Sequence, residues 1–344
     1  MKLSNHQLAS SVSGAVRTWE SPEGFHVCRF TEAQTDAYLI RREDFHRKAL
    51  SASGIVFRFR TDSRYLKLSV LTRSGSSRNF FGVDVTADGK YVDSLKNYEK
   101  RPVFGTNYVT MEAPQGAFEK TFSLDDGEKE VAVYLPWSVE CVITGLELEE
   151  GASFVPVKRE KKLLAFGDSI TQGYDALEPR NKYITALADR LGMEEINKAI
   201  GGEVFWPELA AMQDDLTPDL ITVAYGTNDW GNLPREEVER NCEGFYQNLR
   251  KAYPNTPILA LTPVWRPDTE GRVNRFGPFH EVEQMIREKT ARLPGVTVIR
   301  GWELIPQELP LYADLRLHPN DEGFRHYFES LHREPEIEKL TADS

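Results

Sequence analysis

The hydrophobic pattern of this chain changes near residue 160, and that change limits the folds the chain can adopt. Between about residues 25 and 150, apolar residues recur at every second position, as in Ile55, Phe57 and Phe59. Alternation over short runs with turn residues between them is typical of half-buried antiparallel strands. We therefore expect residues 1–155 to form an N-terminal β-sandwich of the jelly-roll type.

After a polar connection over residues 151–161, short apolar runs alternate with amphipathic stretches. Alternation of strand and helix indicates parallel strands joined by right-handed crossovers. We expect residues 160–344 to form a doubly wound α/β domain. Its predicted strands are 163–166, 195–199, 219–225, 257–261 and 296–299, and its predicted helices are 182–191, 206–212, 236–252, 280–293 and 321–331.

Composition excludes some classes of partner. The 344 residues suffice for two domains, and 40% hydrophobic with 28% charged residues is typical of a globular protein. A net charge of −11 argues against binding to nucleic acid or to an anionic membrane. The sequence leaves a homo-oligomer open.

Cysteine usage and the N-terminus favour a cytoplasmic protein. The first residues lack an apolar core behind a basic start, so we expect no secretory signal. Cys28, Cys141 and Cys242 show no metal-ligand spacing and are too few for a disulfide framework. We expect three reduced, buried thiols and no metal site.

The first predicted strand of the α/β domain leads into Gly167-Asp168-Ser169. Open α/β sheets place their ligands at the carboxyl ends of strands, so the Ser169 hydroxyl could face a substrate there. Backbone N–H groups nearby could hold a developing oxyanion. Alternatively, this tripeptide is an ordinary turn in which Ser169 caps the next helix.

Three further loops follow in the same domain. Gly201-Gly202 allows a backbone N–H to point into a site, and Asn228 can offer its amide to an oxyanion. His318 could act as a general base, with Asp314 close enough to orient it or remaining a solvated carboxylate. These side chains together predict acyl transfer to a serine.

The motifs resemble those of the SGNH, or GDSL, hydrolases over about residues 162–335. The match includes Gly-Asp-Ser-Ile-Thr-Gln-Gly, Gly-Thr-Asn-Asp and His-Pro-Asn-Asp-Glu-Gly. The resemblance implies a flavodoxin-like five-stranded parallel sheet, Ser169 as nucleophile and His318 as base. It also implies an oxyanion hole of the Ser169 N–H, the Gly202 N–H and the Asn228 side chain, with no cofactor.

Two positions depart from the family pattern. Ala199 stands where the second block usually has its first glycine, which leaves Gly202 in place. The family's acid lies three residues before the histidine, where this chain has Leu315, and Asp314 lies four before. Either a local bulge brings Asp314 to His318, or the site is a Ser–His dyad with another group orienting the imidazole.

A β-sandwich ahead of such a domain resembles two-domain bacterial carbohydrate and acetyl esterases. That resemblance implies a serine esterase that removes small acyl groups, chiefly acetyl, from a small-molecule or oligosaccharide ester. Trp206 and Trp265 lie on loops expected to face the site and could stack on a sugar, or could pack against the sandwich. The aromatic residues Phe80, Phe81, Tyr91, Tyr98 and Tyr108 could form a sugar platform, although core packing fits them better.

Other functions stay open at this point. One is a lysophospholipase or thioesterase, which would need an apolar acyl groove. Another is a catalytically inactive carbohydrate-binding protein, which the departure at Leu315 permits.

Overall fold

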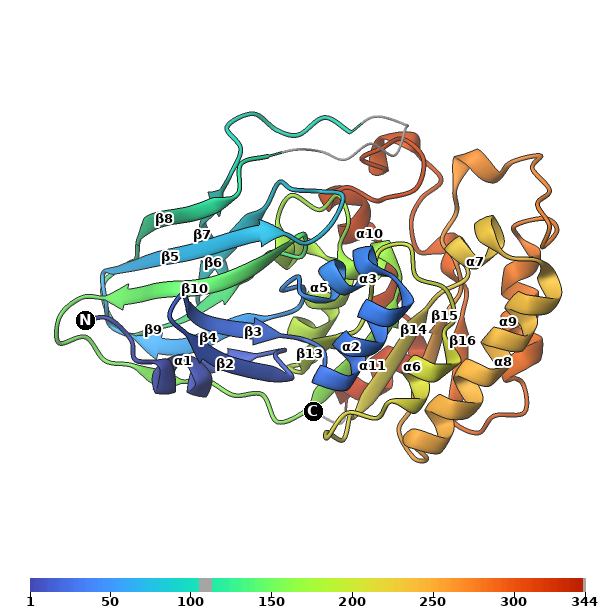
Figure 1. The fold of residues 1–344 in the computed structure, drawn as a ribbon, viewed down its shortest axis with the longest axis horizontal. Helices are drawn as coiled ribbons and strands as arrows, with labels where there is room; N and C mark the ends of the chain where they lie inside the picture. Colours follow the sequence, from blue (N-terminus) through green and yellow to red (C-terminus); the bar gives the residue numbers. More distant parts are fainter. Residues whose placement is uncertain (105–112, 343–344) are drawn as a thin grey trace.

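The computed structural model describes residues 1–104 and 113–342. Within these ranges two antiparallel sheets lie beside an α/β domain with a five-stranded parallel sheet (Figure 1). The strands of the antiparallel sheets come from residues 12–156, and those of the parallel sheet from residues 162–299. The expected fold class, an antiparallel β-sandwich followed by a flavodoxin-like domain, is confirmed.

The sandwich packs its two sheets face to face around one core. One sheet has the order β1-β4-β9-β6-β7, with β11 beside β4, and the other has the order β2-β3-β10-β5-β8. Phe57 and Val83 from the first sheet pack in one cluster with Leu66 and Leu68 from the second. The strands are β1 (Val12–Ser13), β2 (Arg17–Ser21), β3 (Gly24–Cys28), β4 (Val56–Thr61), β5 (Tyr65–Ser74), β6 (Gly82–Ala87), β7 (Lys90–Lys96), β8 (Gly116–Ser123), β9 (Lys129–Tyr134), β10 (Val139–Leu148) and β11 (Val155–Pro156).

The parallel sheet has the order β13-β12-β14-β15-β16, which is the 2-1-3-4-5 order of flavodoxin-like folds. Its strands are β12 (Lys162–Gly167), β13 (Glu194–Asn197), β14 (Leu220–Ala224), β15 (Ile258–Leu261) and β16 (Val296–Ile299). Its helices are α4 (Ser169–Gln172), α5 (Tyr183–Arg190), α6 (Pro207–Ala211), α7 (Thr227–Asn232), α8 (Arg235–Ala252), α9 (Glu281–Thr290), α10 (Asp321–His332) and α11 (Pro335–Ala342). Short 3₁₀ turns are η1 (Pro179–Asn181), η2 (Pro267–Thr269), η3 (Gly301–Glu303) and η4 (Leu309–Leu311).

The N-terminal half also contains helices that the period-two pattern did not predict. These are α1 (Asn5–Ser11), α2 (Glu32–Arg41) and α3 (Glu43–Ala49). In Figure 1, α2 and α3 lie between the sandwich and the α/β domain. Tyr38 and Phe45 from these helices share a buried cluster with Phe205 of the α/β domain. The two halves are therefore joined by a continuous apolar core.

The aromatic side chains considered as a sugar platform mostly belong to cores. Phe80 packs with Trp137 in a cluster that continues into the α/β domain, and Phe81 lies in the sandwich core. Tyr91 is more exposed and lies beside the Arg180 guanidinium. Tyr108 lies outside the described residues.

Two further observations concern cysteines and membrane spans. Cys28, Cys141 and Cys242 are free and buried. Across the described ranges, no helix combines the length and apolar character needed to cross a bilayer.

Candidate active site

Ser169 lies at the carboxyl end of β12, at the start of the short helix α4. The Asp168 side chain accepts a hydrogen bond from the Ile170 N–H (3.0 Å), which fixes the turn between strand and helix. Gly167 is required there, because a Cβ atom would lie 2.4 Å from Thr171 Oγ1. The local sequence thus places a largely buried serine at the edge of the sheet, and Asp168 caps the start of α4.

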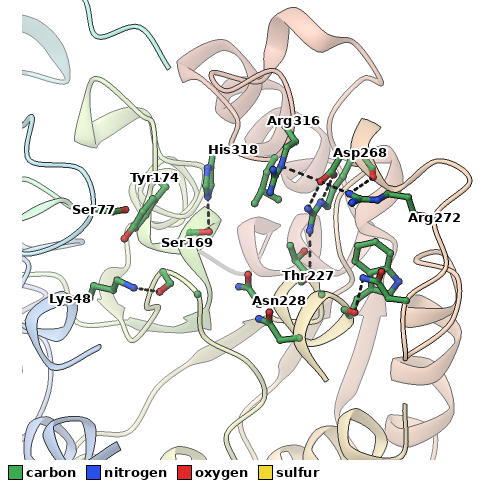
Figure 2. A pocket seen from close by; sticks show the side chains of 18 residues that line it. Lys48, Ser77, Ser169, Tyr174, Thr227, Asn228, Asp268, Arg272, Arg316 and His318 are labelled. Carbon is green, nitrogen blue, oxygen red and sulfur yellow. Dashed lines mark hydrogen bonds and ion pairs between the residues drawn. The ribbon is translucent and has the colours of Figure 1, made fainter. Parts of the chain in front are cut away.

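His318 meets Ser169 from a loop that precedes α10. Its Nε2 atom lies 2.9 Å from Ser169 Oγ, as Figure 2 shows. A bridge between Tyr312 and Pro319 closes this loop at its base. The Ala313 N–H also donates to the His318 carbonyl (2.8 Å), so the loop holds the imidazole in place.

Asp314 reaches the other side of the imidazole, with Oδ2 3.1 Å from His318 Nδ1. Its second oxygen accepts hydrogen bonds from the N–H groups of Arg316 (3.0 Å), Leu317 (2.7 Å) and His318 (3.1 Å). Leu315 absorbs the extra residue by adopting a left-handed conformation with φ of 53°. The local bulge considered from the sequence is therefore present, and it brings Asp314 to His318 despite the four-residue spacing.

The electrostatics of this pair follow from burial and charge. Burial alone would lower the pKa of His318, but the carboxylates of Asp175 and Asp314 raise it to about 9. Burial opposes ionisation of Asp314, yet the imidazole and the backbone N–H groups hold its pKa well below the usual range. Asp314 therefore stays ionised, and His318 binds its proton tightly.

The predicted oxyanion residues line the same cavity, of about 460 Å³. Gly202 adopts a φ of 89°, a conformation that favours glycine. The Asn228 amide donates to the Glu203 carbonyl (3.0 Å), which orients the side chain and leaves its second N–H for another acceptor. Ser169, Gly202, Asn228 and His318 are thus brought together, and their catalytic roles stay predictions.

The N-terminal half supports the loop that carries Gly202. Lys48 of α3 donates to the Gly201 carbonyl (2.7 Å), and the buried Arg29 donates to the Ala199 carbonyl (2.6 Å). A side chain at Gly201 would collide with the Tyr174 ring, 2.6 Å from the Cβ position. The position of this loop therefore depends on both halves of the chain.

The remaining wall of the cavity contains a cluster of charged side chains around Asp268. Asp268 accepts hydrogen bonds from Arg266 (2.9 and 2.8 Å) and pairs with Arg316 (3.1 Å) and Arg272 (3.7 Å). Figure 2 shows this group across the cavity from Lys48 and Tyr174. Among the described lining residues, Lys48, Arg266, Arg272 and Arg316 are the cations and Asp268 is the carboxylate.

The two tryptophans considered for sugar stacking both pack against other side chains of the protein. Trp206 packs against Tyr38 and Arg41 of α2, with the guanidinium 4.3 Å from its ring. Trp265 is buried against Tyr312, whose hydroxyl donates to the Trp265 carbonyl. Neither is among the residues that line the cavity, so neither ring is placed to stack on a sugar there.

Sequence reasoning also missed two residues next to His318. Asp175 Oδ2 lies 3.3 Å from His318 Nδ1, and Arg78 of the sandwich binds Asp175 with Nε 2.7 Å from Oδ1. The signal for Asp175 was its place six residues after Ser169, two residues past the Gly-Asp-Ser-Ile-Thr-Gln-Gly motif. Arg78 lies in a loop of the other domain, and nothing in its local sequence points to the site.

Asp175, Asp314 and His318 are also the described side chains whose grouping could hold a metal ion, with ligand atoms within 4.8 Å of one another. A metal at Nδ1 would place the imidazole proton on Nε2, facing Ser169. His318 could then not accept the serine proton. The arrangement therefore fits hydrogen-bonded orientation of a base better than metal ligation.

Comparison with known proteins gives a family match and several structures with the same fold. Residues 165–326 match the model of the GDSL-like lipase/acylhydrolase family. A search of curated proteins finds no match. Among solved structures, the salicylyl-acyltransferase SsfX3 from a tetracycline biosynthetic pathway is similar, with a TM-score of 0.76 at 21% identity over 96% of this chain and 94% of that chain.

Two further structures share the fold. A Bacteroides ovatus protein named as a GDSL-like lipase has a TM-score of 0.76 at 18% identity, covering 99% of this chain and 98% of its own. A family two carbohydrate esterase from Clostridium thermocellum, in complex with cellohexaose, has a TM-score of 0.65 at 14% identity, covering 96% and 99%. The likeness therefore extends over both domains.

Proposed function

We propose that this protein, whose α/β domain belongs to the GDSL-like lipase/acylhydrolase family, is a serine esterase that removes small acyl groups, chiefly acetyl, from a saccharide or similarly polar carrier. The observation that carries the proposal is the contact of 2.9 Å between Ser169 Oγ and His318 Nε2, with Asp314 on the opposite ring nitrogen. This is the order of contacts that activates a serine hydroxyl.

The reaction follows from these positions. Neutral His318 removes the Ser169 proton while Oγ attacks the ester carbonyl, and Asp314 stabilises the imidazolium that forms. The N–H groups of Ser169 and Gly202 and the Asn228 amide hold the oxyanion of the tetrahedral intermediate. His318 then protonates the leaving alcohol and activates the water that releases the acid from the acyl-enzyme.

The cavity wall supports a polar carrier. Its cations and amides suit hydroxyl, carbonyl or acidic groups, and a long acyl chain would have to lie against charged side chains. This argues against the lysophospholipase alternative. The carbohydrate esterase from Clostridium thermocellum shares the fold and binds cellohexaose, which favours a saccharide as the carrier.

Ester hydrolysis by wild type and by Ser169→Ala tests the proposal. We expect wild type to hydrolyse p-nitrophenyl acetate faster than the octanoate, and Ser169→Ala to lose this activity while keeping its unfolding midpoint. Ser153→Ala, at a sandwich hydroxyl that bonds to Asp62, is a matched control and should behave as wild type. Release of acetate from acetylated oligosaccharides then identifies the carrier.

Two outcomes would redirect the assignment. Preference for the octanoate would point to lipids or thioesters. Absence of any Ser169-dependent rate on the two nitrophenyl esters and on acetylated oligosaccharides would refute the esterase and favour a binding protein.

A further inference from the structure

His318 faces a second carboxylate besides Asp314. Asp175 Oδ2 lies 3.3 Å from His318 Nδ1, close to the 3.1 Å of Asp314 Oδ2. All three side chains are almost completely buried. Asp175 adopts a φ of 70°, a left-handed conformation that aspartate tolerates better than most residues.

Arg78 supplies the charge that makes this arrangement stable. Its Nε lies 2.7 Å from Asp175 Oδ1 and its Nη2 lies 3.4 Å from Asp175 Oδ2. Arg78 is buried as well, in the loop between β5 and β6 of the sandwich. Two carboxylates around one imidazole repel each other, and the Arg78 guanidinium offsets this repulsion with a positive charge. With Arg78 in place, both can accept from the Nδ1–H.

We propose that Asp175 is a second positioning residue for His318, and that Arg78 of the sandwich holds Asp175 in place, so that the base is oriented from both domains. The proposal rests on the proposed function, in which His318 accepts the Ser169 proton. Both carboxylates favour the tautomer with the proton on Nδ1, which leaves the Nε2 lone pair facing Ser169.

Within residues 1–104 and 113–342, the other groups placed around His318 have different contacts. The Tyr174 ring lies beside the imidazole, with ring centroids 5.4 Å apart. The carboxylate of Asp168 accepts a hydrogen bond from the Ile170 N–H, and its interaction with His318 is electrostatic. Arg316, which follows Asp314 in the loop, pairs with Asp268. Arg78, Asp175 and Asp314 are thus the charged groups to vary.

The arrangement predicts that Asp175 and Asp314 partly replace each other. In a site with one acid, loss of that acid costs on the order of 10⁴-fold in turnover. Here we expect Asp175→Asn and Asp314→Asn each to lose roughly ten- to a hundredfold, because one carboxylate remains on Nδ1. The double variant should approach the full loss of on the order of 10⁴.

The experiment that tests the proposal follows the titration of the His318 imidazole by NMR, alongside the pH profile of kcat/KM on p-nitrophenyl acetate. We expect Asp175→Asn to lower the imidazole midpoint by about one pH unit or more, because an attractive charge is removed. The acidic limb of the pH profile should move in the same direction. A residue that only supported the fold would leave this midpoint unchanged.

Asp189→Asn is the matched control, since Asp189 also joins the two halves through arginine. It lies near the C-terminal end of α5 and pairs with Arg58 (2.6 Å) and Arg159 (2.7 Å). Its loss should leave the His318 midpoint at the wild-type value. If burial of an unpaired Arg78 prevents Asp175→Asn from folding, the double variant Arg78→Gln with Asp175→Asn removes both charges and should still show a lowered midpoint.

An imidazole midpoint in folded Asp175→Asn, or in the double variant, equal to that of wild type would overturn the proposal. The NMR measurement needs no substrate. A lowered midpoint in a protein without Ser169-dependent hydrolysis would therefore reject the proposed function while placing Asp175 on the imidazole.

Discussion

Hydrolysis and stability should respond to pH in opposite directions, because both depend on the His318 proton. The imidazole is fully buried, and its pKa is raised to about 9 from an ordinary 6.5. Only the neutral form can accept the Ser169 proton. At pH 7 about 1% of the free enzyme carries neutral His318, and at pH 8 about 10%. We expect kcat/KM to rise about tenfold per pH unit and to level off near pH 9.

Stability should fall over the same interval. A group whose pKa is higher in the folded state binds its proton more tightly there, so its stabilisation is complete below pH 6.5 and is lost as the pH rises through 9. The difference between 6.5 and 9 corresponds to about 3 kcal/mol of the free energy of unfolding. This is a large part of the 5–15 kcal/mol typical of a folded protein.

Two measurements check the reasoning. The first is kcat/KM on p-nitrophenyl acetate between pH 6 and 10, corrected for the rate of Ser169→Ala. The second is the urea midpoint of wild type and His318→Gln at pH 6.5 and 9. Burial raises the pKa of Asp84 and of Asp229 to about 7, and His318→Gln keeps their contributions.

The stability of wild type should fall by about 3 kcal/mol more than that of His318→Gln between these pH values. A kcat/KM that is already level below pH 7, or an equal loss of stability in both proteins, would refute the assignment of a raised pKa to His318.

Three more predictions address the loop, the rim and the domain contact. Leu315→Asn should raise the free energy of unfolding by about 0.5–1 kcal/mol in urea titrations, because Leu315 is half-exposed in a left-handed conformation that asparagine tolerates better; an unchanged or lower midpoint would contradict this. Arg272→Gln should raise KM for acetylated oligosaccharides several-fold and leave the rate of p-nitrophenyl acetate hydrolysis within about twofold of wild type. Arg272 lines the outer wall of the cavity and pairs with Asp268 at 3.7 Å, so its loss should affect binding of the carrier and not the reaction. Equal effects on both substrates would contradict this. Removal of residues 1–155 should leave an α/β domain that aggregates in size-exclusion chromatography and is inactive in the ester assay, because Phe205 and Tyr174 would lose buried partners. A monomeric, active fragment would contradict this prediction.

The parallel sheet was predictable because its strands are short, continuous apolar runs. The sequence placed a strand at residues 296–299, as observed, and a helix at 236–252, which the structure extends by one residue to Arg235. Such runs record burial on both faces, which is a local property. Helices α2 and α3 escaped prediction because the period-two pattern around them dominated, although Thr31 and Gln34 form a capping box that marks the start of α2.

The site was predictable as far as each residue lies at a strand end or in a motif. Ser169, Gly202, Asn228 and His318 meet because parallel strands end at the same edge of the sheet. Whether Asp314 reaches His318 could not be decided from the spacing of the two residues, because contact depends on the left-handed backbone conformation at Leu315. The two alternatives for Trp265 could not be decided from the sequence, because tertiary packing, here against Tyr312, sets the direction in which a loop side chain points.

What the sequence could not show is how far the first domain enters the site of the second. Arg29 and Lys48 bind carbonyls in the segment from Ala199 to Gly201, directly before Gly202. Arg78 binds the carboxylate beside the base. These cations come from three separate places in the N-terminal half, and each donates to a group next to the proposed site.

A sandwich that only bound substrate could shift relative to the α/β domain without disturbing buried contacts at the site. In this protein such a shift would break them. The buried contacts of Arg29 and Arg78 bind backbone and side chains at the site itself, so a displacement would leave polar groups unpaired in the interior. We therefore expect the sandwich and the α/β domain to unfold together as one cooperative unit. Two separate transitions in urea, with loss of activity following only the second, would contradict this.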